Sequence, residues 1–209
     1  MNIIKPDAKV VLFSNEEAAR VAMRWSLVRP NIVVCKESRA EFVAEIYGEV
    51  KIIYEESLLD AVQNKGIDTP AWRFYSTDTS YYSLGIKTAL PLFFSGLTYW
   101  DDDVIMRKLW PEDNWHSREL MSTWPKGLIA TCAANAVNWG FATCDAGAWR
   151  ISETYGYYKF FQRFWSDSDL NDACERHPRY NAESRILDQL ILGGWFKSTS
   201  SIQKCAPEY

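Results

Sequence analysis

Several familiar catalytic signatures are missing from this 209-residue sequence. It contains no GxxxxGK[ST] loop, which excludes a P-loop nucleotide site, and no GxGxxG follows its first expected strand, which argues against dinucleotide binding. GxSxG and HExxH are absent as well. Because His116 and His177 are the two histidines of the chain, a Ser-His-Asp hydrolase has few candidate bases.

The sequence also lacks a basic excess and any signature of export. Its net charge of −4 and pI near 5.3 provide no basic footprint for nucleic acid. Residues 1–7 do not resemble a secretory signal, and no apolar run reaches membrane-spanning length. The five cysteines are odd in number and form no CxxC, as in proteins with reduced thiols. We therefore expect a cytoplasmic protein without a membrane span.

Aromatic residues are abundant, with ten tryptophans, eleven tyrosines and ten phenylalanines. They indicate a thick core or an aromatic binding cleft. The length suits one well-cored domain, and the sequence shows no repeat, low-complexity tract or linker. We expect residues 1–209 to form a single domain, with a loose tail from about residue 197.

Hydrophobic patterns in the first third of the chain predict strands that alternate with helices. Apolar runs over 9–13, 31–35 and 50–54 read as strands, and a helical pattern follows each of them. Ser14 and Glu17 have the spacing of a capping box for the first helix, whose apolar positions include Val21 and Trp25. Such alternation predicts the α/β class, with a mostly parallel sheet flanked by helices.

The remaining elements are expected as follows. Residues 66–81 form a loop, 82–94 a helix that Pro91 ends, 97–100 a strand, 136–144 a strand, 166–180 a polar connection, and a last helix begins at 182. Asp145 is expected to cap a helix that carries Trp149, Ile151 and the aromatic residues up to Trp165.

Three consecutive carboxylates, Asp101 to Asp103, follow the apolar strand at 97–100. Clustered carboxylates repel one another and are costly to desolvate. A hard cation such as Mg2+ or Mn2+ relieves both costs, and a diphosphate can complete its coordination shell. Since alternate side chains of a strand share a face, Asp101 and Asp103 would point together and Asp102 away. An acidic turn that simply ends the strand is the alternative.

Three more motifs accompany this Asp-x-Asp motif. The segment 82–91 places Lys87 on a helix before the strand, Asn138-Trp139-Gly140-Phe141 follows it, and Asp188-Gln189 precedes an apolar helix. Together, over about residues 9–196, they resemble the nucleotide-sugar glycosyltransferases of the GT-A fold, in particular glycosyltransferase family 8 and its relatives. The resemblance implies a GT-A-like, Rossmann-like domain that transfers a sugar from a nucleoside-diphosphate sugar.

The resemblance also implies residue roles. Asp101 and Asp103 would hold Mn2+ or Mg2+ against the two phosphates, with Asp102 on the ribose or sugar. The remaining donor-binding candidates are Phe13, Ser14, Asn15, Lys87, Asn138 and Gly140. Asp188 and Gln189, the catalytic candidates, would face the sugar hydroxyls or the acceptor.

Several features stay open at this level. Members of family 8 commonly place a histidine on the metal after the Asp-Gln element, whereas no histidine follows Gln189 here, so the third metal ligand is unassigned. The acceptor is a glycan, a protein, a small molecule or a modified nucleic-acid base, and charge does not favour nucleic acid. The stereochemical course and the donor base and sugar are also open.

Two alternative functions remain. A haloacid-dehalogenase-type phosphatase would use Asp101 as nucleophile and Asp103 as acid/base, although Ile105 stands where that motif carries Val or Thr and about half the chain precedes it. A sugar- or nucleotide-binding protein without turnover would also use an aromatic cleft.

Overall fold

The computed structural model describes residues 8–77, 82–106, 147–151 and 154–176, together with Asp188, Ile191 and Leu192. The chain divides into two compact units. The first comprises residues 1–68, 89–109 and 147–155, and the second comprises 69–88, 110–146 and 156–209. A single domain over 1–209 stays a prediction, and the tail from about residue 197 lies outside the described residues.

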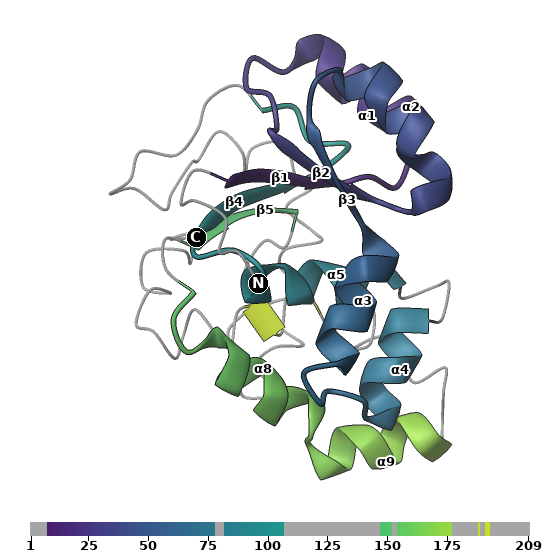
Figure 1. Cartoon of the computed structure of the whole chain (residues 1–209), viewed down its shortest axis with the longest axis vertical. Coiled ribbons are helices and arrows are strands. Elements are labelled where there is room, and N and C mark those ends of the chain that lie inside the picture. Colours follow the sequence, from purple (N-terminus) through teal and green to yellow (C-terminus); the bar gives the residue numbers. More distant parts are fainter. Residues whose placement is uncertain are drawn as a thin grey trace, which may run out of the picture. The chain divides into compact units, whose positions relative to one another are not determined.

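The first unit contains a five-stranded sheet within the described residues (Figure 1). Its strands are β1 (Ala8–Leu12), β2 (Ile32–Cys35), β3 (Lys51–Tyr54), β4 (Leu97–Asp101) and β5 (Ala148–Ile151). The order is β3-β2-β1-β4-β5, with β1 to β4 parallel and β5 antiparallel to β4. The predicted α/β class with a mostly parallel sheet is therefore confirmed.

Strand β2 is apolar along its whole length, and β1 is apolar except at Lys9. Val10, Val33 and Val34 are each 0% exposed, because a parallel sheet is covered on both faces and gains stability from apolar residues at every position. The edge strand β3 is less buried. All three runs that were read as strands from sequence are confirmed, the less buried β3 included.

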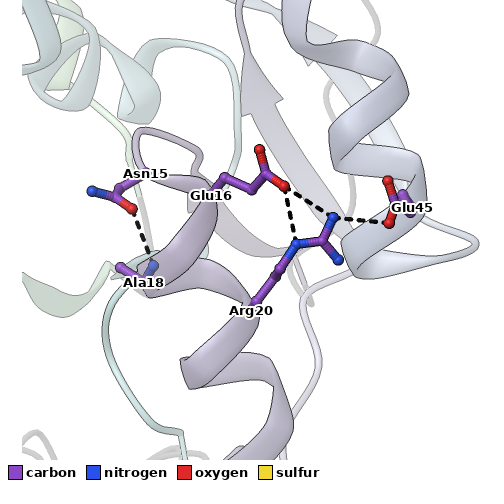
Figure 2. A network of polar contacts seen from close by, with 5 residues as sticks. All are labelled: Asn15, Glu16, Ala18, Arg20 and Glu45. Carbon is purple, nitrogen blue, oxygen red and sulfur yellow. Dashed lines mark hydrogen bonds and ion pairs between the residues drawn. The ribbon is translucent and has the colours of Figure 1, made fainter.

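Helices follow the first three strands of the sheet: α1 (Glu16–Trp25), α2 (Ala40–Tyr47, preceded by the 3-10 turn Glu37–Arg39) and α3 (Glu55–Gln63). The predicted capping box at the start of α1 is wrong. Asn15 is the capping residue, and its side chain accepts a 3.1 Å hydrogen bond from the backbone N–H of Ala18 (Figure 2). The Ser14 hydroxyl instead donates to Asp102.

The buried face of α1 also differs from the predicted one. Ala19 and Ala22 face the core, whereas Val21 and Trp25 are 52% and 60% exposed. Alanine lets the helix approach the sheet closely, so the small residues mark the packed face. The spacing of the larger apolar residues was misleading for this reason.

The helices α1 and α2 lie side by side (Figure 1). On their outer surface, Arg20 binds Glu16 at 3.0 Å and Glu45 at 2.8 Å (Figure 2). These side chains are exposed, and exposed ion pairs contribute little to stability. Buried packing joins the two helices to the sheet, since Ala19 of α1, Val43 of α2 and Val33 of β2 lie in one buried cluster.

The second unit contains four helices in the described residues: α4 (Pro70–Thr77), α5 (Tyr82–Ala89, whose last residue is assigned to the first unit), α8 (Tyr157–Trp165) and α9 (Ser168–Arg176). Aromatic rings form its core. The ring centroid of Trp72 lies 5.6 Å from that of Phe161 and 5.2 Å from that of Trp165, and both contacts are edge-to-face. The backbone N–H of Ala71 donates to Asn171 at 2.9 Å, which joins α4 to α9.

Two predicted elements are wrong, and the helix expected from Asp145 to Trp165 is wrong in its first part but confirmed in its later part as α8. The expected loop 66–81 contains α4, whose Pro70 occupies a first-turn position that tolerates proline. The expected polar connection 166–180 contains α9. Trp149 and Ile151 lie in strand β5 rather than in a helix, and Trp149 pairs with Tyr99 of β4. The predicted helix 82–94 is confirmed as α5 followed by the 3-10 turn Leu90–Leu92, while the expected strand 136–144 lies outside the described residues.

Gly85 in α5 provides a test of how α5 meets α4. A Cβ atom at this position would lie 2.8 Å from the backbone oxygen of Tyr75. In an ordinary helix, Gly→Ala stabilises by roughly 1 kcal/mol. Here we expect Gly85→Ala to lower the free energy of unfolding by about 1–3 kcal/mol, because the backbones must move apart. Urea unfolding measures this change, and a stabilised variant would contradict the close approach.

Candidate functional site at the carboxyl edge of the sheet

The sheet reverses its direction of growth between β1 and β4. The chain adds β2 and then β3 on one side of β1, and β4 then pairs on the other side. Ligand sites of open α/β sheets form at such a switch point, beyond the carboxyl ends of the strands. Leu12 is directly opposite Asp101, so the segments that follow β1 and β4 lie next to each other. Residues 13–15 and 101–103 therefore lie at one edge of the sheet.

Asp102 connects these two segments. Its side chain is 5% exposed and accepts hydrogen bonds from the backbone N–H groups of Ser14 (2.6 Å) and Asn15 (2.8 Å). The Ser14 hydroxyl also donates to it at 3.0 Å. The carboxylate thus holds the end of β1 against the end of β4. The predicted contact of Asp102 with the ribose or sugar stays a prediction. It would be made by a carboxylate that already accepts hydrogen bonds from Ser14 and Asn15.

Burial raises the pKa of the Asp102 carboxyl group above its ordinary value, and the neighbouring charge of Asp101 acts in the same direction. The hydrogen bonds from Asn15 and Ser14 act in the opposite direction because they stabilise the ionised form. Burial is the largest influence, so ionisation of Asp102 opposes folding. Burial, together with the negative charge of Asp102, raises the pKa of the Tyr47 phenol.

Asp101 is the last residue of β4 and is held at several points. Its backbone N–H donates to Gly147 at 2.7 Å, and its carbonyl accepts from Val104 at 3.0 Å. The Tyr99 hydroxyl donates to its Oδ1 at 2.5 Å. Sequence pattern did not point to Tyr99, although positions 99 and 101 of one strand share a face.

Asp102 and Asp103 form a turn after the strand. The alternation of side chains along a strand therefore does not extend to Asp103, which is exposed. A shared cation on Asp101 and Asp103 stays a prediction that depends on the turn rather than on the strand.

The residues present suit a divalent cation that is shared with a phosphate ligand. The described part of the chain contains no group of three or more His, Cys, Asp or Glu side chains that could hold a metal. Mg2+, however, commonly uses only one or two carboxylates and completes its shell with water and substrate phosphates. Asp101 and Asp103 provide that donor set.

Of the predicted nucleoside-binding residues, Ser14 and Asn15 are exposed at this edge. The prediction for Phe13 needs correction. Its side chain is 6% exposed and packs with Ala19, Val33 and Val43 in the core, because it continues the apolar pattern of β1. Phe13 therefore supports the strand end rather than a ligand surface.

In the second unit, the structure brings together Lys87 and Asp188, which are far apart in the sequence. Lys87 Nζ lies 3.1 Å from Asp188 Oδ2, and the two residues are 8% and 4% exposed. Lys87 is thus a buried, paired lysine rather than a solvated one. A buried charge needs a partner of opposite sign, which explains why the two occur together. Gln189, Asn138 and Gly140 lie outside the described residues.

Comparisons with known proteins provide one structural likeness. No protein-family model matches the sequence, and no curated protein matches it. The crystal structure of mouse xyloside xylosyltransferase 1 in its apo form is similar, with a TM-score of 0.48, 11% sequence identity, and coverage of 92% of this chain and 83% of that chain. A likeness this distant does not decide an activity.

Two further findings concern the described residues in general. In the described ranges, no helix combines the length and the apolar character that crossing a bilayer requires. Cys35 and Cys174 are free and buried, and burial raises the pKa of each thiol to about 11. These two thiols are protonated at neutral pH, as expected of core residues.

Replacing Asp102 tests its role as a connector. We expect Asp102→Ala to lower the free energy of unfolding by about 1–3 kcal/mol, because two backbone N–H groups lose their acceptor. Asp102→Asn is the matched control. Its amide oxygen can accept from Ser14 and Asn15 while its amide group donates to the Ser14 hydroxyl, so we expect a loss within about 1 kcal/mol. Equal losses in urea unfolding would contradict the connector role.

The pH dependence of stability tests the charge on Asp102. Its pKa is raised in the folded state, so its favourable contribution is complete below the unfolded pKa of roughly 3.9 and is lost as the pH rises through the folded pKa. The stability of the wild type minus that of Asp102→Asn should therefore decrease as pH rises through this window. An increase would show that hydrogen bonds to the ionised carboxylate outweigh burial.

Proposed function

We propose that the protein is a metal-dependent glycosyltransferase that moves a sugar from a nucleoside-diphosphate sugar to an acceptor. The observation that carries this proposal is the position of Asp101 at the end of β4 and of Asp103 in the turn that follows, beside the end of β1 at the switch point of the sheet. The exposed Ser14 and Asn15 lie beside them and are suited to contact the nucleoside.

Asp101 and Asp103 would hold Mn2+ or Mg2+ together with the donor diphosphate. When bound, the cation supplies Lewis-acid stabilisation of the charge on the leaving nucleoside diphosphate. Asp102 contributes by keeping Ser14 and Asn15 fixed next to the two ligand positions. This division of roles leaves one of the three carboxylates to the fold.

Lys87 and Asp188 are proposed to act on the sugar side of the reaction. The ion pair fixes the side chains of both residues, and such fixed groups bind and orient a substrate without further loss of conformational freedom. Asp188 and Gln189 are the proposed catalytic residues, and Asn138 and Gly140 the proposed sugar-pocket residues. The proposal includes a cytoplasmic location and any of the four acceptor classes.

A thermal-shift panel of nucleoside diphosphates and their sugars, with and without Mn2+, tests the proposal. We expect a Mn2+-dependent stabilisation of the wild type that Asp101→Ala and Asp103→Ala each abolish, because each variant removes one of the two protein ligands. Asp102→Asn is the control, since it also removes one negative charge from the cluster but keeps the connecting hydrogen bonds.

The assignment would be wrong if both alanine variants kept the wild-type donor affinity and metal response. A second measurement separates a transferase from a binding protein. Mn2+-dependent release of nucleoside diphosphate from a nucleotide-sugar, with water as acceptor, is expected of the transferase. Free phosphate released from a sugar phosphate would instead indicate a phosphatase.

A further inference from the structure

The hydrogen bond between Tyr99 and Asp101 connects the interior of the sheet to the candidate metal site. We propose that Tyr99 is a positioning residue, which fixes the Asp101 carboxylate in a conformation ready for a divalent cation. This inference rests on the proposed function, because it assumes that Asp101 is a cation ligand.

The ring of Tyr99 is held firmly in place. It is 0% exposed and stacks on Trp149, with ring centroids 4.9 Å apart and an angle of 26° between the planes. Trp149 is the register partner of Tyr99 on the antiparallel strand β5, so the stack is a direct cross-strand pair. The phenol oxygen therefore has little freedom to leave Asp101.

The Asp101 backbone is also fixed. Its N–H donates to Gly147, and its carbonyl closes the turn by accepting from Val104. The 2.5 Å hydrogen bond from the Tyr99 hydroxyl to Oδ1 restricts the rotation of the carboxylate. Holding a ligand side chain before the cation arrives removes part of the entropic cost of binding.

The chemistry of the contact suits this role. Carboxylates that ligate metals are usually hydrogen-bonded by a neighbouring group, which orients them and keeps them anionic. A neutral phenol donates a hydrogen bond without adding a competing positive charge. Asp103 is exposed and follows the strand in a turn. The Tyr99 contact therefore preorganises Asp101 as a proposed cation ligand.

Tyr99→Phe tests the inference because it removes the hydroxyl and keeps the stacked ring. The readout is the affinity for Mn2+ alone, followed by the electron paramagnetic resonance signal of the free ion. We expect Tyr99→Phe to weaken Mn2+ binding by about 10- to 100-fold. Tyr157→Phe is the matched control, because Tyr157 is also 0% exposed and its hydroxyl donates at 2.5 Å, but to the carbonyl of Thr88.

Asp101→Ala, measured in parallel, separates failure of the inference from failure of the proposed function. Support requires loss of binding in Asp101→Ala, the expected weakening in Tyr99→Phe, and an affinity within about twofold of wild type in Tyr157→Phe. If Asp101→Ala loses binding but the two Phe variants bind equally well, the inference is overturned and the metal site stands. If the wild type does not bind Mn2+, or Asp101→Ala binds like it, both fall.

Thermal unfolding of the two Phe variants excludes a general loss of structure. Each variant removes one oxygen atom from a buried, hydrogen-bonded ring, so we expect similar decreases in Tm. A weaker affinity in Tyr99→Phe at a Tm equal to that of Tyr157→Phe supports positioning. If the loss of Mn2+ affinity in each variant is proportional to its decrease in Tm, the positioning role of Tyr99 is contradicted.

Discussion

The hydrogen bonds that Asp102 accepts from Ser14 and Asn15 hold the end of β1 against the end of β4. The rest of the carboxyl edge depends on this contact, because it lies where the sheet reverses its direction of growth and where ligands of such sheets bind. The contact has a cost, since Asp102 is a buried acid beside Asp101. Two backbone N–H groups and a hydroxyl offset that cost.

The three consecutive aspartates therefore occupy different environments although they are chemically identical. Asp101 ends strand β4 and accepts a hydrogen bond from Tyr99. Asp102 is buried against the segment that follows β1, and Asp103 is exposed. A turn at the strand end produces this separation. Asp102 stabilises the fold, whereas Asp101 and Asp103 remain for a candidate cation site. A metal therefore need not offset the charge repulsion and desolvation cost of all three carboxylates.

Features that depend on local sequence patterns could be predicted, whereas contacts between residues far apart in the sequence could not. The apolar runs of β1 and β2 report their burial on both faces, and the strands were predicted correctly. Helix α4 was missed because Pro70 and its polar neighbours resemble a loop, and the β5 segment was read as helical because aromatic residues fit either period. The Asp102 connection and the Lys87–Asp188 pair join distant positions, and no local pattern encodes them.

The central claim is that Asp101 and Asp103 together bind one divalent cation at the carboxyl edge of the sheet. Anomalous diffraction from crystals soaked with Mn2+ and a nucleoside diphosphate tests it most directly. The account predicts a single manganese peak within direct coordination distance of both carboxylates and of the diphosphate oxygens. Manganese bound at another site, or a diphosphate bound without either carboxylate, would contradict it.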